Sequence, residues 1–187
     1  AAAPTPLADL EARFQPIELW SRDIGSGTDE QRLNLQPILA EGKLFAADSD
    51  GKVLALDAAS GKTIWSVDLD MPVSGGPGVG DNLVLVGTSE GNVVALGAET
   101  GELRWTAQLT SEILSVPKVQ AGVVVVQSAD GKLFGLEVTN GNERWRYERE
   151  VPVLTLRGTG SPALVDGIAY AGMAGGRLIA LRIDNGG

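Results

Sequence analysis

Two short motifs in this sequence carry residue types that could bind a metal ion or a phosphate group. DSDGK at 48–52 has the aspartates and glycine that open a calcium loop, but no glutamate stands at the twelfth position. VSGGPGVGDN at 73–82 is as glycine-rich as a phosphate loop, but it lacks the GK[ST] ending and is followed by a strand pattern. We interpret the first motif as a hairpin turn and the second as the opening of a strand, and we expect no metal site.

The sequence lacks the residues on which most catalytic sites depend. It contains no histidine and no cysteine, which removes the commonest general base, thiolate chemistry and disulfides. Asp57 and Glu137 occupy equivalent places after strands, where they are expected to stabilise turns. The net charge of −9 would repel a phosphate backbone, so nucleic acid is not an expected partner. We predict no catalytic residues, no cofactor and no enzyme activity.

The dominant feature of the chain is an internal repeat. The segments 51–65, 91–105 and 131–145 align without gaps and end at Trp65, Trp105 and Trp145. An isolated Trp20 lies nearer the start, in PIELWSRDI. Each tryptophan is expected to pack against a neighbouring repeat and to donate its indole N–H to a carbonyl there.

Each repeat reads as four short strands with glycine at the turns, which predicts an all-β fold of propeller blades. KLFAAD, KVLALD and KTIWSVD alternate apolar and polar residues, as half-buried strands do. Residues 1–16 are expected to form a tail or linker, and residues 17–187 a partial propeller. The predicted blades are 37–68, 77–109, 117–149 and 162–184, and a strand at 17–24 is predicted to close another blade.

Two connections between repeats are longer than the others. From a tryptophan to the next repeat proline, the long connections span 20–37 and 145–162, whereas the other two span 65–77 and 105–117. The first long connection, SRDIGSGTDEQRLNLQP, is polar and predicts a solvated loop. The second contains VPVLTLRG, either a strand extended by five residues with buried leucines or an exposed apolar pair beside an arginine. The second alternative has the composition of an interface hot spot.

These motifs resemble a known family. The pattern A-x-D-x-x-x-G-x-x-x-W, complete in ALDAASGKTIW, resembles the tryptophan-docking repeat of the pyrroloquinoline-quinone (PQQ) propeller superfamily. The opening PTPLADLEARFQPIELWSRDIGSG, the blades and VPVLTLRGTGSP together resemble the BamB family of lipoproteins, in the outer-membrane β-barrel assembly machinery of Gram-negative bacteria. The resemblance covers about the N-terminal half of that family's eight-bladed propeller.

The resemblance implies a non-enzymatic scaffold at the periplasmic face of the outer membrane, anchored through a lipidated cysteine that this sequence does not contain. It implies binding to the POTRA domains of BamA through Leu154, Thr155, Leu156 and Arg157. The family also uses acidic residues in a blade that this chain does not reach. A second implied role is to present blade edges to nascent outer-membrane proteins by strand addition.

Several alternatives stay open from the sequence. The chain could be a fragment of a PQQ-dependent dehydrogenase or of the propeller ectodomain of a sensor protein. It could also close on itself as a four-bladed ring through residues 17–24. The favoured alternative is half of an eight-bladed propeller, whose raw blade faces would need the missing half, a second copy or another partner.

Overall fold

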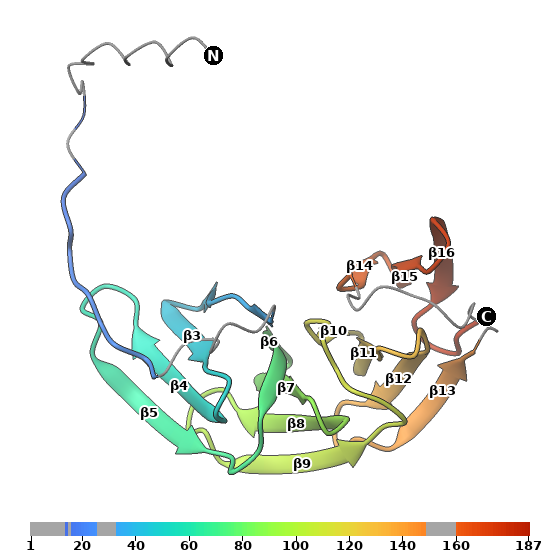
Figure 1. Cartoon of the computed structure of the whole chain (residues 1–187), viewed down its shortest axis with the longest axis horizontal. Helices are drawn as coiled ribbons and strands as arrows, with labels where there is room; N and C mark the ends of the chain where they lie inside the picture. Colours follow the sequence, from blue (N-terminus) through green and yellow to red (C-terminus); the bar gives the residue numbers. More distant parts are fainter. Residues whose placement is uncertain (1–13, 15, 26–32, 149–159) are drawn as a thin grey trace, which may run out of the picture.

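The computed structural model describes residues 14, 16–25, 33–148 and 160–187, and these residues form four antiparallel sheets in an open arc (Figure 1). The first sheet contains β2 (Ile38–Ala40), β3 (Lys43–Ala47), β4 (Lys52–Asp57) and β5 (Thr63–Asp68). The second contains β6 (Val73–Gly80), β7 (Leu83–Thr88), β8 (Asn92–Gly97) and β9 (Leu103–Gln108), with β1 (Asn34–Leu35) beside β6. The third contains β10 (Lys118–Gln120), β11 (Val123–Gln127), β12 (Leu133–Glu137) and β13 (Glu143–Tyr147). The fourth contains β14 (Ala163–Val165), β15 (Ile168–Met173) and β16 (Arg177–Arg182).

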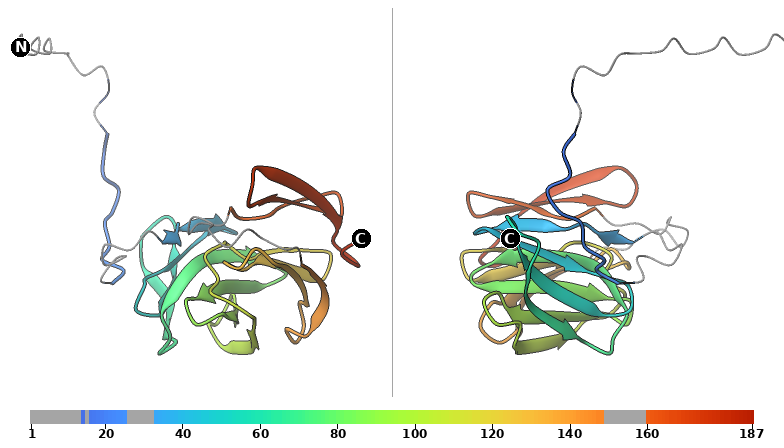
Figure 2. Two further views of the ribbon diagram at one scale, coloured as in Figure 1. Left: turned by 45° about the vertical axis from the view of Figure 1, so that its right-hand side comes forward. Right: turned by 90° about the vertical axis from the view of Figure 1, so that its left-hand side faces the viewer.

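The predicted all-β propeller, built of consecutive four-stranded blades, is confirmed. Within each sheet, consecutive strands pair antiparallel, and the sheets follow one another around the arc in sequence order (Figures 1 and 2). The second blade begins at Val73, slightly before its predicted start at 77. The fourth blade has three strands among the described residues, whereas each of the other three blades has an outer strand as well. No described residue belongs to a helix that could span a membrane.

One expectation about the N-terminal region stays a prediction and another needs correction. Residues 17–24 have no described strand beside them and form no hydrogen-bonded ladder here, so their closing of another blade stays a prediction. The following connection is not wholly a solvated loop. Asn34 and Leu35 pair in parallel with Gly75 and Gly76 of β6, and Leu35 packs against the core between the first two blades.

The middle strands of the first three blades are buried on both faces, which the alternating pattern did not predict. Every residue of β7 is buried, and so are the four central residues of β4. The reason is that the second and third blades lie between two other blades, while the first blade packs on the second and on Trp20 and Ile24 of the N-terminal segment. The outer strands β5, β9 and β13 each have one buried position in an otherwise exposed or half-exposed pattern, and that position is the tryptophan.

Each tryptophan docks on the blade that follows it. The indole N–H of Trp65 donates to the carbonyl of Ala98 at 3.0 Å, and that of Trp105 donates to the carbonyl of Val138 at 2.8 Å. Trp145 donates to the carbonyl of Ile183 at 2.7 Å. Trp20 makes the same contact with the first blade, through the carbonyl of Ala58 at 3.1 Å. Each acceptor carbonyl lies in the turn that follows the third strand of the receiving blade, so the same contact is repeated along the arc.

A glycine in the receiving blade makes room for each ring. A Cβ atom on Gly101 would lie 2.7 Å from Cε3 of Trp65, and one on Gly141 would lie 2.5 Å from Cε3 of Trp105. Gly61 and Gly186 stand in the same relation to Trp20 and Trp145. All four glycines have positive φ angles, so they satisfy a turn and a close approach together.

The two rims of the arc carry different segments. One rim, here called the docking rim, carries the turns that receive the tryptophans, at 58–61, 98–101, 138–141 and 183–186. The opposite rim, here called the link rim, carries the connections between blades and the turn between the second and third strand of each blade. Backbone bonds from Ile113 to Thr88 and from Ala129 to Glu112 join these link-rim segments.

The glycine contact predicts a measurable stability difference between two similar substitutions. Gly141→Ala and Gly122→Ala both place a side chain at a positive φ of nearly the same value, but the Cβ at position 122 meets nothing closer than Val138 Cγ1 at 4.0 Å. Both variants should lose about 1 kcal/mol through the backbone. Gly141→Ala should lose about 1–3 kcal/mol more, because the new methyl group must displace Trp105. Urea unfolding measures both free energies, and equal losses would contradict the docking role of Gly141.

Candidate functional site

The predicted partner-binding residues Leu154, Thr155, Leu156 and Arg157 lie outside the residues that the structure describes. Both ends of their segment are described. Glu148 follows the outer strand of the third blade, and Ser161 precedes the inner strand of the fourth. Both ends lie on the link rim, so the segment connects two blades there. The candidate site is therefore built from these two ends and the side chains that hold them.

A network of charged side chains holds the first end. Lys132 Nζ lies 2.8 Å from Asp130 Oδ2 and 3.8 Å from Glu148 Oε1. Arg146 Nε lies 3.0 Å from the same oxygen of Glu148. Thr110, in the preceding connection, donates its hydroxyl to Asp130 Oδ2 at 2.9 Å. The network thus ties the start of the segment to a hairpin turn of its own blade and to the neighbouring connection.

The second end is fixed to a connection that lies deeper in the structure. The backbone N–H of Val116 donates to Ser161 Oγ at 2.9 Å. The adjacent Ser115 is fully buried and donates its hydroxyl to the carbonyl of Gln127 at 2.7 Å. Because Ser115 is anchored in this way, the position of Ser161 is set by the interior of the third blade. Leu154, Leu156 and Arg157 thus belong to a segment whose two ends are both held against the third blade, one by its charged side chains and the other through Val116.

Electrostatics at the first end give Asp130 an unusual acidity. Burial raises the pKa of this carboxyl, but hydrogen bonds from Lys132, Ser128 and Thr110 together outweigh burial, so its pKa is lowered. The hydrogen bond to Asp130 in turn raises the pKa of Lys132. Both shifts favour the charged forms, so the ion pair stabilises the fold where both groups are ionised.

The aspartate motif at 48–52 is a hairpin turn, as interpreted from the sequence. Asp48 is buried, and its Oδ1 accepts hydrogen bonds from the backbone N–H groups of Asp50, Gly51 and Lys52 at 2.9–3.1 Å. That carboxylate oxygen is therefore engaged by its own turn. Over the described ranges, no three acidic side chains gather in a way that could hold a metal ion.

The glycine-rich motif at 73–82 is a strand pressed against the next blade. It forms β6 and the turn that follows it. A Cβ on Gly75 would lie 2.4 Å from the carbonyl oxygen of Ser115, and one on Gly78 would lie 1.9 Å from that of Pro117. Close packing of inner strands, rather than a phosphate cradle, is what these two glycines provide.

Asp57 and Glu137 serve the turns in which they lie. Asp57 Oδ1 accepts hydrogen bonds from the hydroxyl and the backbone N–H of Ser60, and these bonds lower the pKa of Asp57. Glu137 forms a bidentate ion pair with Arg144, with N···O distances of 2.7 and 2.8 Å. Both carboxylates are thus used in holding the loop between the third and fourth strand of a blade.

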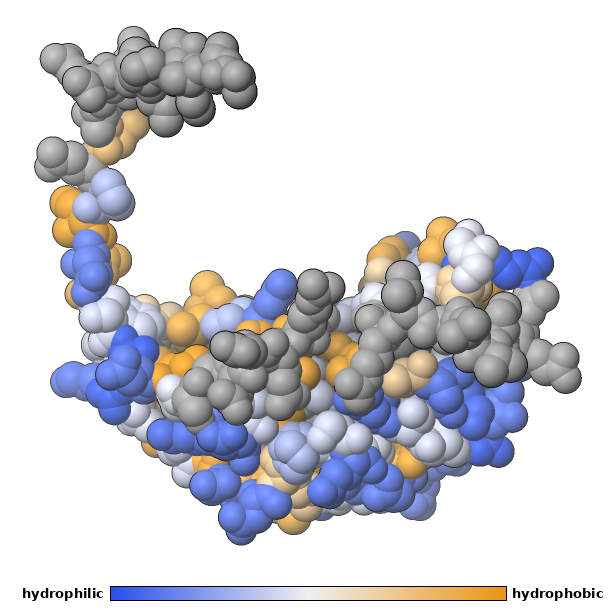
Figure 3. All heavy atoms as spheres, in the orientation of Figure 1, coloured by the Kyte–Doolittle hydropathy of each residue, from blue (hydrophilic) through white to orange (hydrophobic). Residues whose placement is uncertain are grey.

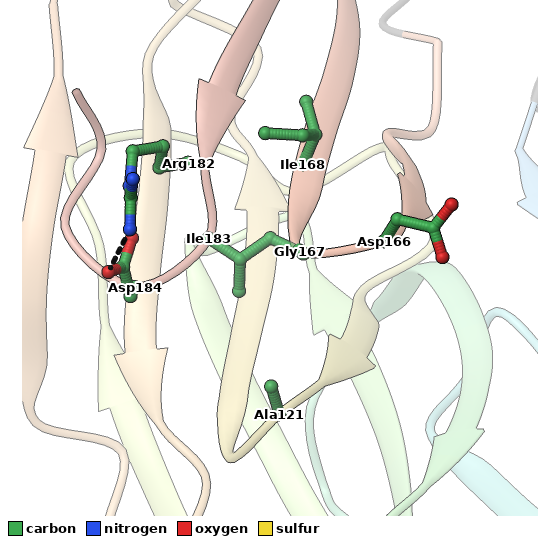
Figure 4. Close-up of a pocket in the computed structure, with 7 residues that line it drawn as sticks. All are labelled: Ala121, Asp166, Gly167, Ile168, Arg182, Ile183 and Asp184. Atoms are coloured by element: carbon green, nitrogen blue, oxygen red, sulfur yellow. Dashed lines mark hydrogen bonds and ion pairs between the residues drawn. The ribbon is translucent and has the colours of Figure 1, made fainter.

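Sequence reasoning missed a cavity on the docking rim (Figure 4). It has a volume of about 260 Å³, and it lies between the third and fourth blades. Its lining is Ala121, Asp166, Gly167, Ile168, Arg182, Ile183 and Asp184. The Arg182–Asp184 pair closes one side with an N···O distance of 2.9 Å.

The same position between the first two blades holds only about 50 Å³. There, Lys43 crosses the gap to Glu99 at 2.5 Å. The residue in register with Lys43 in the third blade is Val123, which is buried and cannot cross. The larger cavity therefore lies at a joint that has no ion pair equivalent to Lys43–Glu99 among the described residues. Because Leu83 replaces the lysine in the second blade as well, the loss of the lysine alone is not a sequence signal for the cavity.

The sequence of this chain is similar to those of known proteins. The family described as "Outer membrane protein assembly factor BamB" matches residues 49–187. The chain belongs to this family. It is 58% identical over 183 residues to the outer membrane protein assembly factor BamB of Pseudomonas aeruginosa, covering 98% of this chain and 48% of that protein. The corresponding protein of Kangiella koreensis is 54% identical, with 98% and 47% covered. The chain spans about half the length of the curated relatives it matches.

Solved structures agree with the BamB assignment. The crystal structure of BamB from Moraxella catarrhalis superposes with a TM-score of 0.76 at 30% identity, covering 83% of this chain and 47% of that one. A quinohemoprotein alcohol dehydrogenase from Pseudomonas putida superposes with a TM-score of 0.64 at 20% identity, covering 83% and 34%. At that level of identity, the second likeness shows the propeller fold alone.

The Asp130 network predicts an acid-dependent loss of stability. A carboxyl with a lowered pKa stabilises the fold above its unfolded pKa, and that contribution disappears as the pH falls through the folded pKa. Asp130→Asn should therefore lower the free energy of unfolding at pH 7 by about 1 kcal/mol. The difference from the unmodified chain should shrink below about pH 4. Urea unfolding from neutral to strongly acidic pH measures both curves, and a difference that persists in strong acid would contradict the assignment.

Proposed function

We propose that this chain belongs to a non-enzymatic scaffold subunit of the outer-membrane β-barrel assembly complex, which binds the POTRA domains of BamA and assists the folding and insertion of outer-membrane proteins. Membership of the BamB family supports this proposal, as does the name of the relatives, outer membrane protein assembly factor. The main support for the proposal is the LTLRG segment at 154–158. It lies between the third and fourth repeats, where the sequence from tryptophan to proline is longer than at 65–77 and 105–117.

The position of this segment suits a docking loop. The connections between the earlier blades span residues 69–72 and 109–117, whereas this one spans 148–162. Its ends are held by the Lys132 network and by the Val116–Ser161 bond. A loop with fixed ends loses less conformational entropy on binding than a free one, which favours affinity.

The composition of the segment fits a protein interface. Leu154 and Leu156 would leave water against an apolar pocket of the partner, while Arg157 would pair with a carboxylate or a backbone carbonyl. Apolar anchors beside an arginine are enriched in such hot spots. The net charge of −9 would influence the orientation and rate of encounter more than affinity.

We place the protein at the periplasmic face of the outer membrane, held there by a lipid anchor outside this sequence. Nascent outer-membrane proteins are a second class of partner, which would add a strand to an exposed blade edge. We infer no catalysis, because the chain contains neither histidine nor cysteine and the acidic groups described above are used in turns.

A double substitution in the loop tests the proposal. Leu154→Ala/Arg157→Ala should weaken binding of this chain to purified BamA POTRA domains by about tenfold or more, equivalent to about 1.4 kcal/mol, because it removes an apolar anchor and its charged neighbour. Isothermal titration calorimetry measures the dissociation constants.

The matched control is Leu103→Ala/Arg104→Ala. It removes the same two residue types from exposed positions of β9, on a blade that has no long connection. This control should bind as the unmodified chain does. Equal binding by all three proteins, or an equal loss in both variants, would contradict a role for the loop.

A further inference from the structure

The joint between the first two blades contains a lysine that fills it. Lys43 begins β3, and its Nζ lies 2.5 Å from Glu99 Oε1 in the docking turn of the second blade. The side chain of Lys43 is only 18% exposed, so its hydrocarbon stem is largely covered while its ammonium group reaches the rim. With the lysine in place, the cavity at this joint holds about 50 Å³. Lys43 thus shows what kind of group this position in the repeat accepts.

The joint between the third and fourth blades keeps the carboxylate of this pair but not the lysine. The residue in register with Glu99 is Asp184, and the residue in register with Lys43 is Val123. Val123 is fully buried and has no amino group to offer to Asp184. The cavity at this joint has a volume of about 260 Å³. The joint is therefore similar to the first one with its lysine removed.

The joint between the second and third blades has lost both members of the ion pair. Leu83 and Thr139 stand there in register with Lys43 and Glu99. Of the three joints between the described blades, the one between the third and fourth is thus alone in having the carboxylate without the lysine. A retained carboxylate beside a cavity is the combination that points to a ligand.

Hydrogen bonds fix the walls of this cavity. The backbone N–H of Ile183 donates to the carbonyl of Gly167 at 2.9 Å, and the carbonyl of Ile183 accepts the indole N–H of Trp145. The backbone N–H of Gly167 donates to Gln120 Oε1 at 3.2 Å, which ties the fourth blade to the third. Figure 4 shows the apolar side chains of Ile168 and Ile183 in the lining. The cavity therefore offers a held, partly apolar surface to a hydrocarbon stem.

The charges around the cavity favour a cation. Its lining contributes two carboxylates, Asp166 and Asp184, and one guanidinium, Arg182, so the net charge of the lining is −1. The hydrogen bond from Arg182 lowers the pKa of Asp184, which keeps this carboxylate ionised at neutral pH. Arg182 takes two of the roughly four acceptor sites of a carboxylate, so Asp184 can accept a further donor. Arg144 of the third blade is itself paired with Glu137.

The rest of the surface would attract a small cation without holding an aliphatic stem. The net charge of the chain is −9, which raises the concentration of cations near its surface. Figure 3 shows mostly hydrophilic side chains along the outer perimeter of the arc, where a hydrocarbon stem would find little apolar contact. The cavity combines the favourable charge with that contact.

We propose that the joint between the third and fourth blades binds a small aliphatic ammonium ion, whose hydrocarbon stem occupies the cavity and whose charged group pairs with Asp184. The ligand takes the place that Lys43 has in the first joint. The volume of the cavity lies below the range of about 300–1,000 Å³ that is typical for drug-sized ligands, so the site suits a molecule of a few carbon atoms. This inference does not depend on the proposed function, because the site is on the docking rim and the proposed loop is on the link rim.

Titration with n-butylammonium chloride at constant ionic strength, followed by NMR of the indole N–H groups, tests the proposal. This ion has the stem and the charge of a lysine side chain. The Trp145 resonance should shift saturably at millimolar concentration, because its acceptor Ile183 lines the cavity. The Trp65 and Trp105 resonances should shift little. n-Butanol, which has the stem alone, and ammonium, which has the charge alone, should bind more weakly. Absence of saturation, equal shifts of all three indoles, or equal binding of n-butanol would overturn the proposal.

Three substitutions locate the ammonium group. Asp184→Asn removes the carboxylate and should weaken binding about threefold or more, as expected for a partly exposed ion pair. Glu99→Gln makes the matching change at the joint that Lys43 already fills, and it should leave the dissociation constant unchanged. Val123→Lys should restore the bridge to Asp184 and abolish the shift of Trp145. Equal effects of Asp184→Asn and Glu99→Gln would overturn the proposal, and this comparison decides even if Val123→Lys does not fold.

Discussion

Contact between a tryptophan ring and a glycine with no Cβ is the interaction on which the rest of this structure depends. It occurs at Gly61, Gly101, Gly141 and Gly186, and each ring also donates its indole N–H to a carbonyl in the receiving turn. The ring excludes water from the joint, while the hydrogen bond fixes its direction. Because the contact repeats with the period of the sequence, each blade is set against the next in the same way. The arc follows from that repetition.

The contacts that stabilise the fold and the segment proposed for recognition lie on opposite rims of the arc. The docking rim carries the tryptophan contacts, and its turns are constrained by ring, carbonyl and positive φ at once. The link rim carries the connections between blades, whose lengths differ. An insertion on the link rim leaves the docking contacts untouched, as shown by Trp145, which docks on Ile183 across the long connection at 2.7 Å. A recognition loop can therefore be added there at little cost to the fold.

The regular period of the repeat was enough to predict the blades, the turns and the docking tryptophans, because each is a local property repeated in register. Features that depend on neighbours outside the repeat were harder to predict. Residues 17–24 resemble an outer strand but form none here, since strand formation needs a partner ladder. The alternation of β4 suggested one buried face, yet one face packs against the second blade and the other against Trp20 and Ile24.

The candidate site also has one part that the sequence predicted and another that it did not. Extra length after Trp145 placed the LTLRG segment between two blades, and the ends of that segment are where the repeat predicted them. The side chains that hold those ends were not predictable, because Lys132, Asp130 and Thr110 meet only through the packing of two separate loops. The cavity beside Asp166 was missed for a similar reason, since it depends on how the third and fourth blades pack together.

Hydrogen exchange of the four indole N–H protons, followed by NMR, tests the docking account most directly. The account predicts that Trp65, Trp105 and Trp145 exchange slowly, because each indole N–H is hydrogen-bonded in a joint between two described blades. Trp20 should also be protected, since it makes the same bond to Ala58 at 3.1 Å. If these protons exchanged at the rate of a free indole, the tryptophans would not be docked, and the joint that orders the arc would have to be sought elsewhere.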